Sequence, residues 1–312
     1  MFSKLVRQKA HYSPTIKSPL LLLILMLSSM LSSAALAADT NQVTINKPRQ
    51  GSTYMFELMK LALSYSSQPY EFVANAETLS RRAQTEAVRN GDLDVMWGGT
   101  STQMEQDFIP VRIDGYRGMM SLRFMLIRKG DQQLFDQVDD YNDLKRLTFG
   151  QGRTWADRDI LESAGLDVVT APKKASLFFM LDGERFDAFP RGATEAWREA
   201  EQYSHLDITV ENGLIISYPL PTYFFVNKKN LTLARDIESG LEKMLVDGRF
   251  DEFFYNNDRI RQFLTQADLN NRRVIQLDNP LLPKNTPLHR KELWLSIEDL
   301  KRGMRQYGGY SG

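Results

Sequence analysis

Short β-type segments alternate with helical segments along most of this chain, and this order constrains the fold more than any other feature. The first part predicts strands at 43–45, 70–73 and 93–97, separated by helices at 53–66 and 79–89. A β-α-β-α-β order is typical of a parallel sheet covered by helices. The opening of the chain therefore predicts one α/β unit.

A second unit repeats this order after a strong predicted strand at 122–127. Its further strands are expected at 146–149, 168–169, 186–189, 214–216 and 223–226, and its helices at 156–164, 174–181, 194–203, 231–245 and 250–255. Four of its apolar residues are expected in the core: Phe178, Phe179, Met180 and Phe186. Two units predict two lobes, each a mainly parallel sheet flanked by helices. We expect a two-strand hinge, with crossings at 121–129 and 222–227.

The first 37 residues have the composition of a secretory signal peptide. Basic residues precede an apolar run from Leu20 to Leu27, and the segment ends in Ala35-Leu36-Ala37. This pattern predicts cleavage after Ala37, and the run is shorter than the about 20 apolar residues of a permanent membrane helix. An uncleaved anchor remains the alternative. The absence of cysteine excludes disulfides and a lipid-modified N-terminal cysteine. We therefore expect a periplasmic protein that is not a lipoprotein.

These patterns divide the chain into five segments. They are the signal peptide at 1–37, the first part of lobe 1 at 38–124, lobe 2 at 125–222, the return to lobe 1 at 223–268, and a C-terminal tail at 269–312. Pro280, Pro283 and Pro287 interrupt regular structure in the tail. A short helix is expected after them, at about 293–304.

The charge balance restricts the possible partners. The chain has 39 Lys and Arg against 39 Asp and Glu, and the signal peptide contains four of the basic residues, so the remaining 35 against 39 give a net charge of −4. This argues against nucleic acid or an anionic membrane surface as the main partner. Export argues against ATP- and NAD-dependent chemistry, and we expect no cofactor, no metal and a monomer.

Three ordered segments, 91–95, 144–152 and 183–189, resemble the family 3 extracytoplasmic solute-binding proteins, the amino-acid-type binding proteins of ABC importers. The helix at 231–248 resembles the one that ends that fold. The resemblance covers about residues 42–260 and rests on order and spacing. It implies a type II periplasmic-binding-protein-like fold, two lobes that close on a small-molecule ligand, and a membrane permease as partner.

The chain departs from this family at both ends of the amino-acid clamp. The family carries Thr-x-x-Arg after the third strand of lobe 1, whereas the stretch from Thr102 here ends in Glu105. The family's Asp of lobe 2 falls at Gly192, next to Arg191. An ordinary α-amino acid is therefore a poor candidate for the ligand. We interpret the chain as a branch of the family without the usual clamp.

Ligands of open α/β sheets bind outside the carboxyl ends of the strands, and four loops there supply candidate ligand-binding residues. These residues are Arg49, Tyr54, Trp97, Thr100, Thr102, Glu105, Arg153, Thr154, Trp155 and Arg191. Arg153 and Arg191 precede predicted helix N-termini, which favour anions. We expect them to hold an anionic end of the ligand, and Tyr54 and Trp97 to contact its flat part. A core role for the aromatic residues and an ion pair of Arg191 with Glu195 remain the alternatives.

The sequence contains little that supports catalysis. His205 and His289 have no neighbouring motif, and neither Gly-x-Ser-x-Gly nor His-Glu-x-x-His occurs. We therefore predict a binding protein, not an enzyme, that captures a small polar or anionic metabolite and presents it to a membrane transporter. Two other functions remain open. One is a ligand-sensing partner of a membrane sensor, and the other is an exported hydrolase or lyase on the same scaffold.

Overall fold

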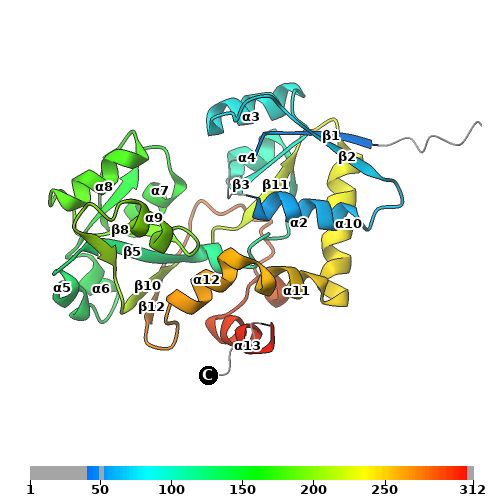
Figure 1. Ribbon diagram of the computed structural model, residues 1–312. Coiled ribbons are helices and arrows are strands. Elements are labelled where there is room, and N and C mark those ends of the chain that lie inside the picture. The colour runs from blue at the N-terminus through cyan, green and yellow to red at the C-terminus, as the bar shows by residue number, and fades with distance from the viewer. Residues whose placement is uncertain (1–40, 49–52, 308–312) are drawn as a thin grey trace, which may run out of the picture. The chain divides into compact units, whose positions relative to one another are not determined.

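The computed structural model describes residues 41–48 and 53–307. The predicted signal peptide and the candidate Arg49 lie outside the described residues. The described part is an α/β fold with two lobes, each built on its own main sheet (Figure 1). The fold class expected from the alternating pattern is confirmed.

The sheet of lobe 1 has the strand order β2-β1-β3-β11-β4. Its strands are β1 (Asn41–Ile45), β2 (Tyr70–Ala74), β3 (Val95–Gly99), β4 (Ile109–Val111) and β11 (Thr222–Val226). Its helices are α2 (Tyr54–Leu63), α3 (Arg81–Asn90), α4 (Thr102–Asp107), α10 (Leu231–Asp247) and α11 (Arg249–Asn256). Strands β2, β1 and β3 are parallel, and β11 runs antiparallel to β3 and β4.

Local sequence signals place several of these elements. Helix α3 ends at Gly91, which has the left-handed φ of 91° that favours glycine at this position. Helices α2 and α10 approach each other closely at Gly240, because a Cβ there would lie 2.0 Å from the Ala62 carbonyl oxygen. Val43 and Ile45 of β1 alternate inward, as a half-buried strand requires. These contacts join the sheet and its helices into one core.

The main sheet of lobe 2 has the order β12-β10-β5-β8, with β9 also paired to β5. Its strands are β5 (Leu122–Arg128), β8 (Phe189–Gly192), β9 (Ile208–Val210), β10 (Leu214–Ser217) and β12 (Arg273–Gln276). Strands β6 (Thr148–Gly152) and β7 (Asp167–Ala171) pair in parallel, and a bridge from Phe149 to Ala188 links them to the start of β8. The helices are α5 (Gln132–Asp136), α6 (Tyr141–Leu144), α7 (Ala156–Ser163), α8 (Lys174–Asp182) and α9 (Ala196–Gln202).

Each main sheet has one strand antiparallel to its neighbours, β11 in lobe 1 and β5 in lobe 2. The chain enters lobe 2 through β5 and returns to lobe 1 through β11. Residues 112–121 form the first crossing and residues 218–221 the second. The expected hinge is confirmed, but the crossings precede the predicted ranges 121–129 and 222–227, which form β5 in the sheet of lobe 2 and β11 in the sheet of lobe 1.

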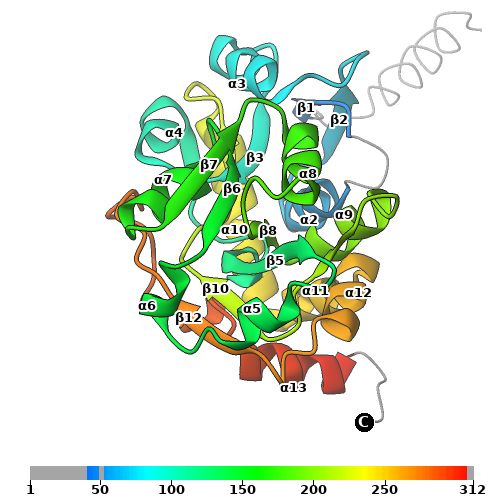
Figure 2. The same cartoon turned by 90° about the vertical axis from the view of Figure 1, so that its left-hand side faces the viewer.

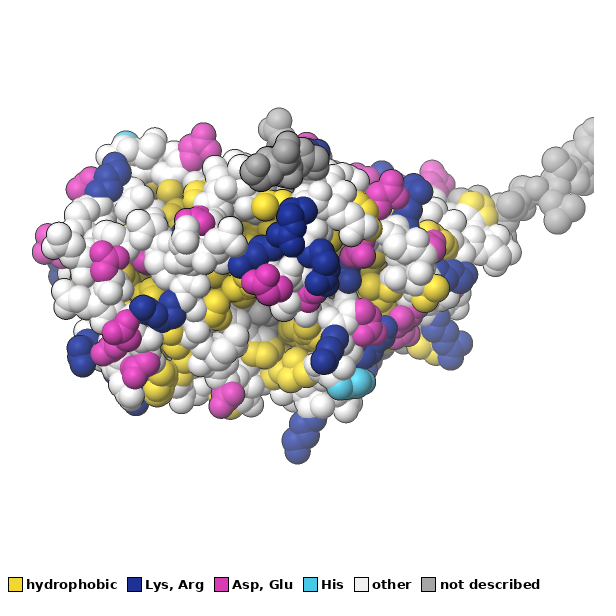
Figure 3. Space-filling model, turned by 90° about the horizontal axis from the view of Figure 1, so that it is seen from below, with side chains coloured by type: hydrophobic (Ala, Val, Ile, Leu, Met, Phe, Trp, Pro, Cys, Tyr) yellow, Lys and Arg dark blue, Asp and Glu magenta, His cyan; other side chains and the backbone are white. Residues whose placement is uncertain are grey.

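A third passage between the lobes was not predicted. After α12 (Asp258–Gln266), residues 267–272 lead to β12, which pairs in parallel with β10 of lobe 2. The irregular stretch with its prolines follows as predicted. The chain ends in η2 (Lys291–Leu293) and α13 (Ile297–Tyr307), later than the predicted helix. On the face seen from below, where α13 lies, basic and acidic side chains are mixed (Figure 3).

Two other sequence expectations are corrected. Phe178 and Phe186 are buried, but Phe179 is 55% exposed, since it lies one step around α8 from the buried face. Strands β3 (Val95–Gly99) and β8 (Phe189–Gly192) begin and end later than the predicted 93–97 and 186–189, so they include the glycines at the end of β3 and Pro190 and Arg191 of β8. Neighbouring strands pair with these residues on the sheet, and this pairing overrides their weak strand propensity.

Candidate ligand-binding site

The predicted site loops of both lobes lie beside the crossings. In lobe 1, the Thr100 N–H donates to the Pro221 carbonyl oxygen of the second crossing at 3.1 Å. In lobe 2, a Cβ on Gly192 would lie 2.5 Å from the Met120 Cε of the first crossing. The ends of β3 and β8 are therefore anchored to the segments that join the lobes.

Tyr54 belongs to the core below the first crossing. Its hydroxyl donates to the Gly115 carbonyl oxygen at 2.9 Å, and its ring stacks on Tyr116 with centroids 4.6 Å apart and contacts Phe253 on another side. Burial raises the pKa of Tyr54 well above its ordinary value. The half-buried Tyr116, whose hydroxyl has no hydrogen-bond partner among the described residues, is the more accessible ring of the pair. The sequence analysis did not consider Tyr116.

Arg81 of α3, a cation that was not predicted as a site residue, lies against Trp97 and the glycine that follows it. The Trp97 ring is half-buried and meets Phe224 edge to face at 6.3 Å. Its carbonyl oxygen accepts a 2.5 Å hydrogen bond from Arg81 Nη1. The Arg81 guanidinium lies against Gly98, where any Cβ would collide with it. The glycine at 98 thus lets a cation cross the end of β3.

Glu105 stands where the resembled family has arginine, and its charge is already compensated. Its carboxylate is 8% exposed and accepts bonds from Arg112 Nε at 3.0 Å and Nη2 at 2.7 Å. Thr100 Oγ1 also donates to it, at 3.0 Å. Thr102 is the exposed first residue of α4, which Ser101 caps. This corner of lobe 1 therefore holds a matched ion pair, in which Arg112 supplies the cation.

The loop after β6 places one open cation beside a packed indole. A Cβ on Gly152 would lie 2.4 Å from the Trp155 ring, so only glycine lets the indole fold onto the strand end. Trp155 stacks with Phe189 at 6.2 Å and 17°. Arg153 and Thr154 are exposed, and the Arg153 side chain has no hydrogen bond or ion pair within residues 41–48 and 53–307. Arg153 can therefore accept an anionic partner from outside the chain.

Arg191 differs from Arg153 in its exposure and in its charged partners. It is 6% exposed and lies between the rings of Trp155 and Phe189, each 4.9 Å from its guanidinium carbon. Glu199 accepts from its Nε at 2.5 Å, and Glu195 lies 3.1 Å from its Nη2. Burial opposes its charge, but the two carboxylates outweigh burial and raise the pKa of Arg191. The ion pair with Glu195 that remained open in the sequence is present.

The carboxylate of Glu199 is fully buried and also accepts from Lys174 Nζ at 2.7 Å. This pair was not predicted from the sequence, because Glu199 lies eight residues after Arg191 and inside α9. The predicted role of Arg191 in ligand binding stays a prediction. The positive charge of Arg191 is already paired with carboxylates inside lobe 2.

A second buried ion pair connects lobe 2 with the second crossing. Arg123 of β5 donates from Nε to Asp157 at 2.6 Å, and Tyr218 donates to the same carboxylate at 2.7 Å. The Arg123 guanidinium also lies 4.8 Å from the centre of the Tyr218 ring. Burial opposes ionisation of Asp157, but the Arg123 charge and the Tyr218 bond outweigh it and lower its pKa. This triad fixes the first turn of α7, next to Trp155.

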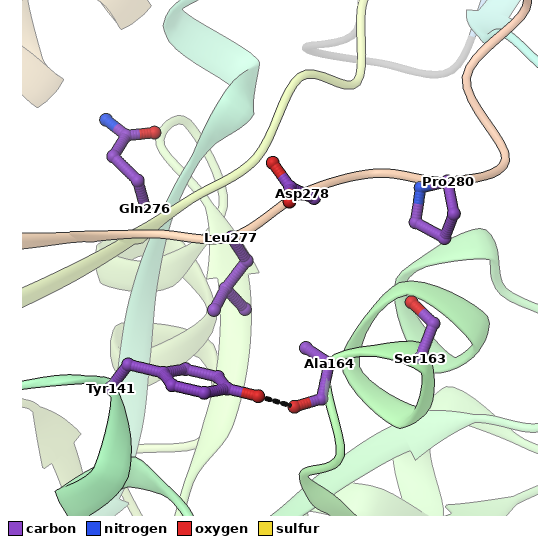
Figure 4. A pocket seen from close by; sticks show the side chains of 7 residues that line it. All are labelled: Tyr141, Ser163, Ala164, Gln276, Leu277, Asp278 and Pro280. Atoms are coloured by element: carbon purple, nitrogen blue, oxygen red, sulfur yellow. Dashed lines mark hydrogen bonds between the residues drawn. The ribbon is translucent and has the colours of Figure 1, made fainter.

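Two larger cavities lie away from these loops. One of about 480 Å³ is lined by Tyr141, Ser163 and Ala164 of lobe 2 and by residues of the stretch 276–280; the Tyr141 hydroxyl donates to the Ala164 carbonyl oxygen across it (Figure 4). The other, of about 540 Å³, lies between both crossings and Trp294. None of the predicted site residues lines either cavity.

Among residues 41–48 and 53–307, no group of three or more His, Asp or Glu side chains is arranged to hold a metal ion. No helix of that part is both long and apolar enough to cross a membrane.

Comparison with known proteins identifies the fold. No protein-family model and no curated protein matches this chain. Among solved structures, it is similar to the probable amino-acid ABC transporter extracellular-binding protein ytmK from Bacillus subtilis. The TM-score is 0.53 at 17% identity, over 69% of this chain and 96% of that chain.

A second structure is the amino acid ABC transporter substrate-binding protein AbpA from Streptococcus pneumoniae, bound to L-arginine. Here the TM-score is 0.50 at 14% identity, over 69% of this chain and 93% of that chain. At such identities the likeness concerns the fold. This chain has the two-lobed fold of the substrate-binding proteins of amino-acid ABC transporters.

Proposed function

We propose that this protein is an extracytoplasmic solute-binding protein that captures a small polar or anionic metabolite between its lobes. The observation that carries the proposal is the shared fold. The chain covers 96% and 93% of two proteins whose descriptions name them as binding proteins of amino-acid ABC transporters. Two lobes joined by crossing strands can close on a ligand and expel water from it. The same likeness supports binding rather than catalysis.

The site proposed here is narrower than the set predicted from sequence. Arg153, Thr154 and Trp155 present the open cation and a packed indole from lobe 2. Thr100, Trp97 and Tyr116 face them from the lobe 1 side of the crossings in this proposal. In this proposal Glu105 and Arg191 do not contact the ligand. Glu105 holds Thr100 in place, and Arg191 holds Trp155. Thr102 stays a candidate at the start of α4, and Arg49 stays a prediction.

The compartment and the partners are part of the proposal. The N-terminal pattern supports export to the periplasm by a cleaved signal peptide, and we propose a monomer that delivers its ligand to a membrane permease. The segment limits 38–124, 125–222, 223–268 and 269–312 stay predictions. We propose to move the lobe limits so that β5, from Leu122, belongs to lobe 2 and β11, from Thr222, to lobe 1, while β12 of the last segment pairs within lobe 2. Capture of a membrane sensor but no permease by the purified protein would favour the sensory alternative.

A ligand screen tests the function. The full chain is expressed with its own N-terminal segment, purified from the periplasmic fraction, and heated with carboxylates, phosphorylated metabolites and amino acids. A ligand at a hundredfold excess over Kd adds about 2.7 kcal/mol to the stability of the folded state. Small-angle scattering should then show a smaller radius of gyration with the ligand. Conversion of the ligand to a product would support the hydrolase or lyase alternative, and an unchanged radius with bound ligand would contradict capture by closure.

Arg153→Gln tests the site. We expect affinity for an anionic ligand to fall about tenfold or more, because a charge-assisted bond contributes about 1.5–3 kcal/mol. Arg185→Gln is the matched control, since Arg185 is an exposed arginine of the same lobe whose side chain has no partner among the described residues. Equal affinity of both variants would exclude Arg153 from the site.

A further inference from the structure

A small pocket between α9 and α12 has the composition of an anion site. Its volume is about 180 Å³, and Arg198 on α9 and Arg259 on α12 line it from opposite sides. The two helices lie next to each other in both ribbon views (Figures 1 and 2). No Asp or Glu lines the pocket. Its charged lining is therefore of one sign.

The side chains of the two arginines have no partners among the described residues. Arg198 is exposed and Arg259 half-buried, and neither side chain makes a hydrogen bond or ion pair with any described residue. The buried arginines of the same lobe are matched by carboxylates, as Arg191 is by Glu199. Two cations that share one pocket repel each other unless an anion lies between them. An external anion would supply the missing charge.

The remaining lining residues suit a hydrated polar ion. Gln262 and Gln266 offer amide donors from α12, and the Thr194 hydroxyl has only the weak acceptor Met120 Sδ, at 3.5 Å. Trp197 and Phe263 form the apolar wall and meet at 5.9 Å. The volume of about 180 Å³ exceeds the roughly 10–15 Å³ that a single water molecule needs. It fits a small oxyanion with its water, or the terminal group of a larger molecule.

We propose that this pocket binds a small oxyanion, held between the guanidinium groups of Arg198 and Arg259. The inference does not rest on the proposed solute-binding function, because Arg153 and its loop do not line this pocket. A bound anion would tie α9 of lobe 2 to α12, which leads into the third passage between the lobes.

Inorganic phosphate, sulfate and acetate are the probes, compared with chloride at constant ionic strength. The midpoint temperature of thermal unfolding of the full chain should rise with the concentration of phosphate or sulfate, and the rise should saturate. Arg198→Gln and Arg259→Gln should each weaken this binding at least tenfold, since each removes one charge-assisted contact. Arg235→Gln, an exposed arginine of α10 without a described partner, removes the same charge and should leave it unchanged.

The outcomes separate the possibilities. Saturation with phosphate and sulfate alone indicates a free tetrahedral ion, and saturation that includes acetate indicates a site for terminal carboxylates as well; both support the proposal. A rise that never saturates, or an equal response of the Arg198→Gln, Arg259→Gln double variant, overturns it. Because neither side chain has a partner in the part of the chain that the structure describes, these variants should fold. The double variant leaves Arg153 intact, so loss of phosphate binding in it is read independently of the proposed solute site.

Discussion

The Asp114 carboxylate of the first crossing accepts a 3.0 Å hydrogen bond from the Thr222 N–H at the end of the second crossing. The same carboxylate accepts from the Tyr116 N–H at 3.1 Å and from the Gly118 N–H at 2.6 Å. Asp114 is 1% exposed. One buried side chain thus fixes the turn of the first crossing and joins it to the second, so any closure of the lobes moves about a point that Asp114 holds.

Asp114→Asn tests this role. Asparagine keeps one acceptor oxygen but replaces the other with a donor, which would face a backbone N–H. We expect the free energy of unfolding to fall by about 1–3 kcal/mol, because a buried donor loses its acceptor. Denaturant unfolding measures this loss. Asp92→Asn is the control, as Asp92 is exposed at the end of α3 and should change stability little. Equal midpoints for the two variants would show that Asp114 does not hold the hinge.

The pH dependence of stability should carry the signature of the same carboxyl group. Burial raises the pKa of Asp114 from 3.8 to about 6, against the opposing effect of its backbone hydrogen bonds. The folded state then binds the proton more tightly than the unfolded state. This contribution is complete below pH 3.8 and is lost as pH rises through about 6, at about 1.4 kcal/mol per pH unit.

The comparison with Asp114→Asn isolates this effect. Between about pH 4 and 6 the stability of the parent, taken relative to the variant, should decline with pH, and above about pH 6 the difference should be flat. Denaturant midpoints at half-unit steps of pH measure it. A relative stability that rises across this window would mean that Asp114 is ionised in the folded protein because its hydrogen bonds outweigh burial.

The sequence predicted the parts of this fold that local patterns determine. The apolar run of β5 and the glycine that ends α3 were sufficient to place those elements. Strand β12, Arg273–Gln276, is only four residues long and has only two apolar residues, Val274 and Ile275, so no sequence pattern predicted it. Its place depends on pairing with β10, which is a tertiary contact. The third passage between the lobes could therefore not be predicted from the sequence.

The sequence indicated which strand ends carry the candidate site, but not which of its charged side chains are paired with others. The strand ends that carry Thr100, Trp155 and Arg191 follow from the alternating pattern. The pattern does not show which charged side chains lack a partner. Ion pairs such as Arg112 with Glu105 depend on the directions of the side chains in the folded chain. Arg153 and Arg191 look equivalent in sequence, yet one is open and the other is enclosed by two aromatic rings and two carboxylates.

Arg191→Gln should destabilise the fold, in contrast to the surface role that the sequence alone left open. It leaves Glu199, which is fully buried, with Lys174 as its remaining cation. Breaking a buried pair on one side costs about 3–5 kcal/mol. Adding Glu199→Gln removes the uncompensated charge and should recover much of this loss. Denaturant unfolding of the two variants measures both effects. A single variant as stable as the parent would show that the pair contributes nothing to the fold.

The C-terminal stretch 277–295 should detach from the hinge when Arg117 is changed. Arg117 is 6% exposed and donates from Nη2 to the Glu292 carbonyl oxygen at 2.9 Å; it also pairs with Asp251 of α11. Its own carbonyl oxygen accepts from the Leu295 N–H at 2.8 Å, and its φ of 50° lies in the left-handed region. A non-glycine residue keeps such a backbone only where its surroundings hold it.

Arg117→Gln loses the ion pair and part of the bonding to Glu292, and so loosens the stretch that it holds. We expect the Leu295 amide to exchange with solvent at least tenfold faster, which corresponds to about 1.4 kcal/mol of local stability. Hydrogen exchange read by mass spectrometry measures it. Arg302→Gln is the control, because Arg302 is exposed on α13 and forms only a surface pair with Asp299. If both variants protect Leu295 equally, the tail is held by its apolar contacts, with Trp294 against Gly118, and not by Arg117.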